Sequence, residues 1–237
     1  MKLAWLLLAW SVGCFAQAPT QVPKVFVTTI QPSLKPQHAL QFDGTALVYT
    51  IRFGAQVETQ KITPTPAQWA AFRHALDELK VWRWRASYTE SRVPDSTTWS
   101  LKVEYADRSV ASAGTAAFPD RSTDRTLPRY AFNRYQLAVQ ELIGRPFGRG
   151  VKSIEVFDVR ELHLVGTHAS KDEAEEWADF RDPKGKVHRV ALHEPVGARG
   201  TLQKVHRSSV TVSVMSRDAK GEWKPQEKTL PLTPAKK

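Results

Sequence analysis

The sequence predicts an α+β fold followed by a smaller all-β unit, and three observations lead to this prediction. Apolar residues recur at helical spacing in two segments, residues 66–79 and 128–143. Beyond residue 149, only short alternating segments bounded by turn residues are found. The 237 residues, 41% of them hydrophobic and 24% charged, suffice for two small globular domains. We therefore expect a two-helix α+β domain at residues 41–148 and a small β sandwich or barrel at residues 149–237.

The first residues have the pattern of a secretory signal peptide: one lysine, an unbroken apolar run over residues 3–10, and then small residues. The run is too short to cross a bilayer as a permanent helix. We assign residues 1–18 to this signal, with cleavage after Ala16 or at a lipoprotein-like site before Cys14. Cys14 is the only cysteine of the chain. It is therefore either a lipid attachment site or lost with the signal, and we expect a periplasmic protein without a disulfide.

Four prolines and little periodicity distinguish residues 19–40 from the segments that follow. Proline-rich sequence favours extended geometry without a packed core. We therefore expect an extended tether between the N-terminus and the first domain, with at most a short strand at residues 25–27.

The first domain contains two predicted helices with clear boundary signals. Thr65 is the N-cap of the first helix, Pro66 lies in its first turn, and Gln68 completes a capping box with Thr65. Gly144 ends the second helix, which begins near residue 128. One face of each helix is apolar, with Trp69, Phe72, Leu76 and Leu79 in the first and Phe132, Tyr135, Val139 and Leu142 in the second. Alternation predicts antiparallel strands at residues 47–53, 81–85, 99–105 and 109–113.

The second unit is predicted to consist of six short strands, at residues 162–167, 176–181, 186–192, 202–206, 210–215 and 228–232. Between the second and third strands lies Asp182-Pro183-Lys184-Gly185, with Asp, Pro and Gly at the positions that a type I turn prefers. These residues predict a β-hairpin.

The formal net charge of +10 is spread along the chain, without a block of like charge. Proteins that bind nucleic acids usually concentrate their basic residues on one face, among aromatic side chains. We therefore expect no nucleic-acid partner. A diffuse positive surface suits weak attraction to anionic lipid or cell-wall material equally well.

The second unit has five histidines, which raises the question of a metal or catalytic centre: His163, His168, His188, His193 and His206. Two pairs of them are five residues apart, and on a strand this spacing directs the two rings to opposite faces. Metal-binding pairs on a strand require a spacing of two. We therefore expect no metal site and no cofactor, and interpret the histidines as half-buried structural residues.

Motifs of common enzyme classes are also missing from the sequence. GRPFGRGVKS, residues 144–153, looks like a phosphate-binding loop, but it follows a helix, and Val151 separates the glycine from the lysine. There is no G-x-S-x-G nucleophile elbow. The acidic run at residues 172–176 is more typical of a solvated loop than of paired catalytic acids. These observations favour a binding protein over an enzyme.

Several short motifs of the second unit occur in one order: LHLVGT at residues 162–167, RDPKGKVHRV at 181–190, AKGEW at 219–223 and TLPL at 229–232. Together they resemble the type IV pilus assembly protein PilP family, which is related to the periplasmic homology region of type II secretion. HEPVGARG, residues 193–200, departs from the family, which usually has a G-D/N-Y-L/M-G-x-N stretch there. The first domain, through TPTPAQWAAFRHALDELKVWRW and TTWSLKVEYADR, resembles uncharacterised bacterial secreted domains, and this resemblance implies no activity.

The PilP resemblance implies a non-enzymatic periplasmic adaptor of a type IV pilus or related secretion assembly. It also implies that the β domain docks on an outer-membrane secretin and that the tether engages inner-membrane alignment-complex proteins. A small β domain can bind a partner through a strand edge and a few anchoring side chains. We expect the partner to contact Lys186, Val187, His188, Arg189, Val190 and Trp223. The alternative is that Val187, Val190 and Trp223 are core side chains, which is the usual place of such residues.

Two alternatives place the function in the domain at residues 41–148. A periplasmic enzyme would require polar side chains of that domain to converge in one pocket, namely Arg83, Arg85, Asp95, Glu104 and Asp107. A cell-wall-binding protein would require tryptophan side chains exposed in a groove.

Overall fold

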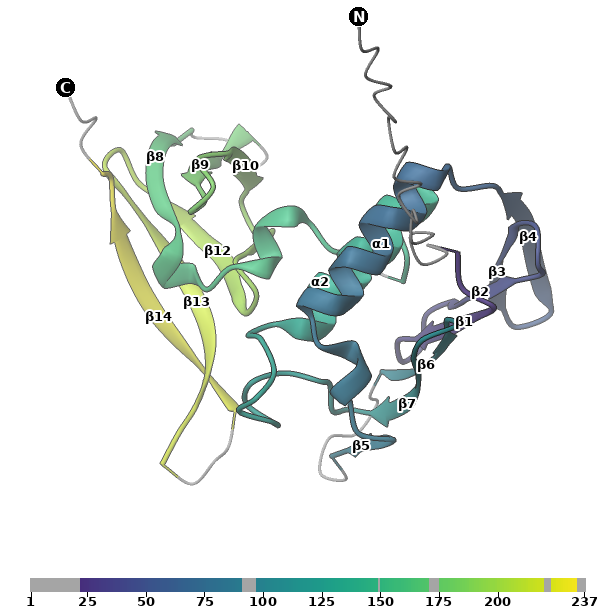
Figure 1. Cartoon of the computed structure of the whole chain (residues 1–237). Helices are drawn as coiled ribbons and strands as arrows, with labels where there is room; N and C mark the ends of the chain where they lie inside the picture. The colour runs from purple at the N-terminus through teal and green to yellow at the C-terminus, as the bar shows by residue number, and fades with distance from the viewer. Residues whose placement is uncertain (1–21, 91–96, 149, 171–174, 220–222, 234–237) are drawn as a thin grey trace, which may run out of the picture.

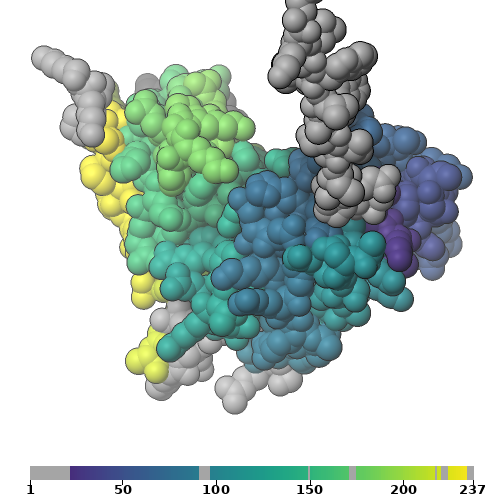
Figure 2. Space-filling model, in the orientation of Figure 1, coloured from purple at the N-terminus to yellow at the C-terminus, as the bar shows by residue number. Residues whose placement is uncertain are grey.

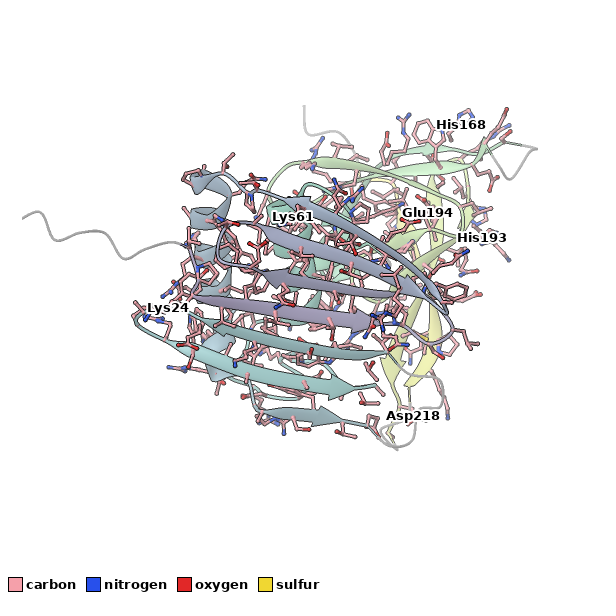
Figure 3. The ribbon with its side chains drawn as sticks, turned by 90° about the vertical axis from the view of Figure 1, so that its right-hand side faces the viewer. Lys24, Lys61, His168, His193, Glu194 and Asp218 are labelled. Carbon is pink, nitrogen blue, oxygen red and sulfur yellow. The ribbon has the colours of Figure 1, made fainter. Side chains whose placement is uncertain are left out.

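The computed structural model describes residues 22–90, 97–148, 150–170, 175–219 and 223–233 (Figure 1). Seven strands of its N-terminal part form one sheet in the order β4-β3-β2-β1-β6-β7-β5, in which only β5 and β7 pair in parallel. Helices α1 and α2 cover one face of this sheet, and no described helix or strand covers the other (Figure 3). The strands are β1 (Val25–Gln31), β2 (Gln37–Phe42), β3 (Leu47–Phe53), β4 (Gln56–Ile62), β5 (Ser87–Thr89), β6 (Thr98–Glu104) and β7 (Ser109–Thr115).

Both predicted helices are confirmed, with their boundary residues in the expected roles. Helix α1 spans Pro66–Glu78, and Thr65 and Gln68 form the capping box: the Thr65 N–H donates to Gln68 Oε1 at 2.8 Å, and the Gln68 N–H donates to Thr65 Oγ1 at 3.2 Å. Helix α2 spans Ala131–Ile143 and ends at Gly144, whose φ of 67° lies in the left-handed region that glycine tolerates. Neither helix of the described residues is long and apolar enough to cross a membrane.

The prediction of an extended tether at residues 19–40 is wrong for most of that segment. β1 lies between β2 and β6 in the middle of the sheet. Phe26, Thr28 and Ile30 of β1 alternate into the core and are at most 4% exposed. The described prolines of this segment flank the strands without interrupting them. The prolines therefore lie in the turns next to two strands, and the segment is not a tether.

The predicted strand at residues 81–85 is also wrong. Val81–Arg83 form a short 3₁₀ helix, η1, which follows Lys80 with a left-handed φ of 53°. Val81 and Trp84 are buried while Arg83 and Arg85 are exposed. Two buried residues three positions apart match one turn of a 3₁₀ helix. The apolar and charged residues that suggested a strand therefore belong to a helical turn.

The core between the sheet and the two helices, here called the N-terminal core, is rich in aromatic side chains. Phe132 of α2 lies at its centre, with ring centroids 4.8 Å from both Trp99 and Phe118. Trp84 packs edge-on against Trp99 at 6.0 Å. These contacts bind α2 to the sheet over a large apolar area.

Two open sheets in the C-terminal part enclose a second core, here called the C-terminal core, whose largest side chain is Phe180. The first sheet has the order β10-β9-β8, and the second runs from β11 to β14 in chain order. The predicted α+β class is confirmed, and none of the described sheets closes into a barrel. The elements are η2 (Ser153–Val156), η3 (Val159–Glu161), β8 (His163–His168), β9 (Trp177–Arg181), β10 (Val187–Ala191), β11 (Pro195–Val196), β12 (Gly200–Val205), β13 (Ser209–Arg217) and β14 (Trp223–Pro231).

Polar contacts join the two parts, which lie side by side (Figure 2). The Tyr130 hydroxyl donates to Asp158 Oδ2 at 2.9 Å. Burial and this carboxylate raise the pKa of Tyr130, so the phenol stays protonated and continues to donate. Gln140 of α2 makes two hydrogen bonds with the backbone of Val151, at 2.8 and 2.6 Å. These contacts fix the C-terminal part against α2.

Candidate docking surface and cleft

The hairpin between β9 and β10 is organised by the side chain of Asp182. Its carboxylate accepts the backbone N–H groups of Lys184 at 2.8 Å and Lys186 at 3.0 Å. Gly185, with a φ of 86°, donates its N–H to the Asp182 carbonyl at 2.9 Å. The predicted turn is therefore present, and its aspartate fixes the start of β10.

Asp182 also binds His188. His188 Nε2 lies 2.8 Å from Asp182 Oδ2, and His188 Nδ1 lies 3.3 Å from Ser153 Oγ. Burial raises the pKa of Asp182, but hydrogen bonds from His188 and from two backbone N–H groups outweigh burial, and the pKa lies below its usual value. The three residue types occur in hydrolase triads. Here the two ionisable side chains are 9% and 4% exposed, and neither lines the cleft between the two parts of the molecule. The group therefore stabilises the hairpin.

β10 is an edge strand, and part of its backbone is free to pair with another chain. The Leu192 N–H donates to the Glu176 carbonyl at 3.0 Å, so even-numbered residues of this strand direct their backbone groups towards β9. Because these groups alternate along an antiparallel strand, those of Val187 and Arg189 point away from β9, to the open edge. The edge therefore offers two consecutive sites for strand addition.

Other edges of the C-terminal part are less accessible than that of β10. The Thr233 N–H donates to the Leu164 carbonyl at 2.8 Å and covers part of the β8 edge. β14 contains Pro225 and Pro231, which have no backbone donor. β11 is only two residues long. Among the described edge strands of this part, β10 is therefore the one that is long enough, free of proline and uncovered, and so the best suited to pair with another strand.

The outer face of the same sheet carries an aromatic and ionic stack that the sequence analysis did not identify. The Trp177 ring stacks on His168, with centroids 5.3 Å apart and planes 12° apart. Arg189 Cζ lies 3.6 Å from the Trp177 ring centroid, and the guanidinium binds both carboxylate oxygens of Asp179 at 3.0 and 3.1 Å. Tryptophan and arginine are enriched among the residues that dominate binding energy at interfaces.

The signal for this stack was present in the predicted hairpin. A turn at residues 182–185 sets the register of the two strands, which pairs Arg189 with Asp179. Trp177 lies two residues before Asp179 and therefore shares its face. The sequence analysis considered the strand after the turn and not its partner.

Five of the residues predicted to bind a partner lie on or next to β10 and fall into two groups. Lys186 and Arg189 are exposed, and Val187 is 48% exposed. The side chains of His188 and Val190 point inwards, and Val190 is 1% exposed in the C-terminal core. Three of these five side chains are thus exposed to solvent, and the other two hold the strand in place.

Two further predicted residues lie elsewhere. Trp223 is the first residue of β14, where it pairs with Arg217 in the other sheet. Cys14 lies outside the residues that the structure describes. Neither residue is therefore brought to the β10 edge by the described structure.

The histidines of the C-terminal part do not come together. His163, His168, His193 and His206 are exposed, and His188 is directed to Asp182. Within the described residues, no group of three histidine, cysteine, aspartate or glutamate side chains could hold a metal ion.

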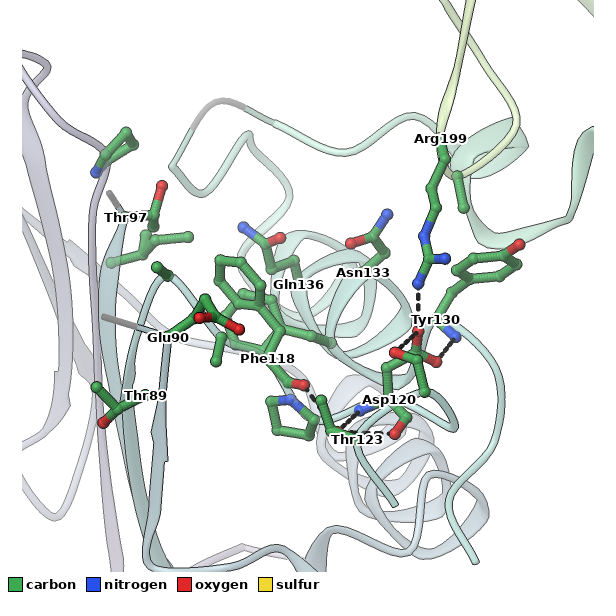
Figure 4. A pocket seen from close by; sticks show the side chains of 18 of the residues that line it. Thr89, Glu90, Thr97, Phe118, Asp120, Thr123, Tyr130, Asn133, Gln136 and Arg199 are labelled. Carbon is green, nitrogen blue, oxygen red and sulfur yellow. Dashed lines mark hydrogen bonds and ion pairs between the residues drawn. The ribbon is translucent and has the colours of Figure 1, made fainter. Parts of the chain in front are cut away.

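A cleft of about 860 Å³ lies between the two parts of the molecule (Figure 4). Ile30 and Phe118 from the N-terminal part and Met215 from β13 give it apolar walls. Asn133 and Gln136 of α2 direct their carboxamides into it, as Figure 4 shows. Sites for small molecules and peptides often lie at such boundaries.

Asp120 organises one end of this cleft. It accepts the Tyr130 N–H at 2.6 Å and binds Arg199 Nη2 at 2.8 Å (Figure 4). Arg199 belongs to HEPVGARG, the stretch that departs from the PilP pattern. The departure thus includes a residue that contacts the N-terminal part.

The two alternative functions find little geometric support in the described residues. Arg85 lines the cleft, but Asp107 binds Arg73 elsewhere, at 3.0 and 2.8 Å. Arg83 and Glu104 do not line the cleft, and Asp95 lies outside the described residues. No tryptophan lines the cleft, and Trp69, Trp84 and Trp99 are buried.

Comparison with known proteins identifies the C-terminal part. The family model described as "Pilus assembly protein, PilP" matches residues 132–232. The C-terminal part of this chain carries a PilP domain. The resemblance predicted from the hairpin and strand motifs is confirmed, and the match begins further upstream, within α2. No curated protein matches the chain.

Three solved PilP structures are similar to part of this chain. The solution structure of PilP from Pseudomonas aeruginosa is 22% identical, covers 36% of this chain and 75% of its own, and gives a TM-score of 0.32. A domain of the type IV pilus biogenesis lipoprotein PilP from Pseudomonas aeruginosa PA01 is 23% identical, with coverages of 34% and 91% and a TM-score of 0.29. A domain of the Neisseria meningitidis PilP pilot protein is 18% identical, with coverages of 36% and 74% and a TM-score of 0.31.

Proposed function

We propose that this chain is a non-enzymatic periplasmic adaptor in type IV pilus assembly or a related secretion machine. The observation that carries the proposal is the PilP family match over residues 132–232. Its partners are an outer-membrane secretin and inner-membrane alignment-complex proteins. In this proposal the chain works without a metal or cofactor, and Cys14 carries a lipid that tethers it to a membrane.

The docking element in this proposal is the edge of β10 with its exposed side chains. An incoming strand would pair with the backbone groups of Val187 and Arg189, and the stack around Trp177 would lie beside it. Arg181, Lys184 and Lys186 are exposed near this edge, and none forms an ion pair with a described residue. Their charge suits an acidic segment of the partner and would speed its association at low salt.

A proline substitution tests strand addition at this edge. Val187→Pro removes an outward-facing N–H at the first position of β10, where proline is tolerated within a sheet. Thr229→Pro is the matched control, because its N–H also faces outwards, on the β14 edge that already contains prolines. We expect Val187→Pro to weaken binding to the secretin's periplasmic domains at least tenfold, measured by biolayer interferometry, and Thr229→Pro to leave it unchanged.

The outcome is informative only for folded variants, so thermal unfolding of both is measured first. If the wild-type chain binds neither the secretin nor an alignment-complex protein, the adaptor proposal is wrong. If both proline variants bind like the wild type, the adaptor role can stand but its docking site lies elsewhere.

A further inference from the structure

The cleft between the two parts contains a polar side chain with no partner. Gln136 is 4% exposed, yet its carboxamide forms no hydrogen bond with any described residue. The carboxamide is not fully buried, because its polar atoms keep contact with the solvent of the cleft. A ligand in the cleft can take the place of that water as a hydrogen-bond partner. Gln136 lines the cleft and points into it (Figure 4). Its position therefore suggests a ligand that hydrogen-bonds to the carboxamide in place of water.

Asn133 extends this polar surface along α2. It lies one turn before Gln136, and residues three apart on a helix are neighbours about 5–6 Å apart. Its Nδ2 donates to the Glu155 carbonyl at 3.3 Å, and its Oδ1 has no described donor. Each carboxamide presents an acceptor beside a donor, the same pair of groups as a peptide bond. Both carboxamides lie on the same face of α2, so one extended segment can reach both.

The rest of the cleft suits the side chains of such a chain. Ile30, Phe118 and Met215 form apolar walls, and the flexible methionine adapts to different side chains. At the rim, Lys35 and Arg85 are exposed and form no ion pair with a described residue. They outnumber Glu90, an acidic residue of the cleft wall that also forms no ion pair with a described residue, and so favour a segment that carries an acidic residue.

We propose that the cleft binds an extended peptide segment of a partner protein, with its main-chain amides paired to Gln136 and Asn133. An apolar side chain of the segment lies between Phe118 and Met215, and an acidic residue lies towards Lys35 and Arg85. This site is distinct from the β10 edge and does not depend on the adaptor role. A glycan is less suited to the cleft, because no tryptophan lines it.

Gln136 and Gln140 provide a matched pair for the test. Both are glutamines of α2, but Gln140 is satisfied by two hydrogen bonds to Val151. Gln136→Met removes the unpartnered amide and keeps the side-chain length. We expect it to leave the thermal midpoint unchanged or raised and to abolish peptide binding. Gln140→Met should lower the thermal midpoint and leave peptide binding within twofold.

The probe is a phage-displayed library of random dodecapeptides, selected on the purified full-length chain with counter-selection against Gln136→Met. A selected peptide is then synthesised with a fluorescent label and titrated by fluorescence polarisation. The proposal predicts enriched peptides with an apolar and an acidic residue, and affinity at least tenfold lower for Gln136→Met.

Three results would overturn the proposal. The first is the absence of any peptide that prefers the wild type to Gln136→Met. The second is a loss of thermal stability in Gln136→Met as large as that in Gln140→Met, which would make Gln136 structural. The third is a shift of the Gln136 side-chain amide resonances by chitotetraose and not by the peptide, which would assign the cleft to a glycan.

Discussion

The N-terminal core is rich in aromatic side chains, whereas the C-terminal core is mostly valine and leucine around Phe180. In the first, two helices bury one broad face of a seven-stranded sheet. In the second, two small sheets have fewer apolar side chains to bury, and polar anchors such as Asp182 and Tyr130 hold the strands and the boundary. A small core benefits more from such anchors because its hydrophobic stabilisation is limited. The C-terminal part is thus the one in which single polar substitutions should matter.

The largest expected effect is in the N-terminal core. Phe132→Ala removes a ring that contacts Trp99 and Phe118 at 4.8 Å each, and it leaves a cavity beside α2. We expect about 3–5 kcal/mol of lost stability, measured by urea denaturation. Amide hydrogen exchange should show the loss mainly in β1, β6 and α2. An equal loss of protection in β9 and β10 would show that the two cores unfold as one unit.

An intermediate effect is expected at the hairpin. Asp182→Asn removes the charge that accepts hydrogen bonds from Lys184, Lys186 and His188. We expect a loss of about 1–3 kcal/mol, again from urea denaturation. A comparable loss from an equally buried polar substitution in the N-terminal part, such as Thr28→Val, would contradict the contrast between the two parts.

The same carboxylate predicts a pH dependence. Because the pKa of Asp182 is lower in the folded chain, its stabilisation is present above the ordinary aspartate pKa and is lost as the pH falls through the lower folded value. The wild-type hairpin should therefore lose protection from hydrogen exchange below about pH 4. Asp182→Asn should not show this loss of protection on acidification. If protection falls with pH in the same way in the wild type and the variant, Asp182 is not the cause of the loss.

The smallest effect is expected at the boundary between the parts. Arg199→Ala breaks the ion pair with Asp120, in which the arginine side chain is 33% exposed. Partly exposed ion pairs contribute roughly 0–1 kcal/mol and are weakened by salt. We expect a loss of at most about 1 kcal/mol that shrinks in high salt. A larger loss of stability that does not depend on salt would mean that the contacts at the boundary contribute as much to stability as either core.

The parts of the fold that could be predicted from sequence are those with a local physical cause. Thr65 and Gln68 specify a capping box by their spacing alone, and Gly144 specifies a helix end. β1 could not be predicted in the same way, because its pairing partners β2 and β6 are set by tertiary structure. Val81 and Trp84 show the limit of a short pattern, which one turn of 3₁₀ helix and a strand can share.

The candidate sites divide in the same way. The hairpin turn followed from Asp182-Pro183-Lys184-Gly185. Alternation alone did not show which face of β10 is buried, so the exposure of Val187 was not predicted. The stack on Trp177 required the register of two strands, which the turn implied. Gln136 gave a local signal that was overlooked, since it lies on the apolar face of α2 between Phe132 and Val139. The cleft itself joins residues from both parts and could not be read from any one segment.

The central claim is that the β10 edge of this PilP domain binds a strand of a pilus assembly partner. Residue-resolved amide hydrogen exchange of the full-length chain, with and without the periplasmic domains of the secretin, tests it most directly. The account predicts that the amides of Val187 and Arg189 gain protection in the complex while those of β14 do not change. Protection confined to the β13–β14 hairpin, or unchanged exchange along β10 in a formed complex, would contradict it.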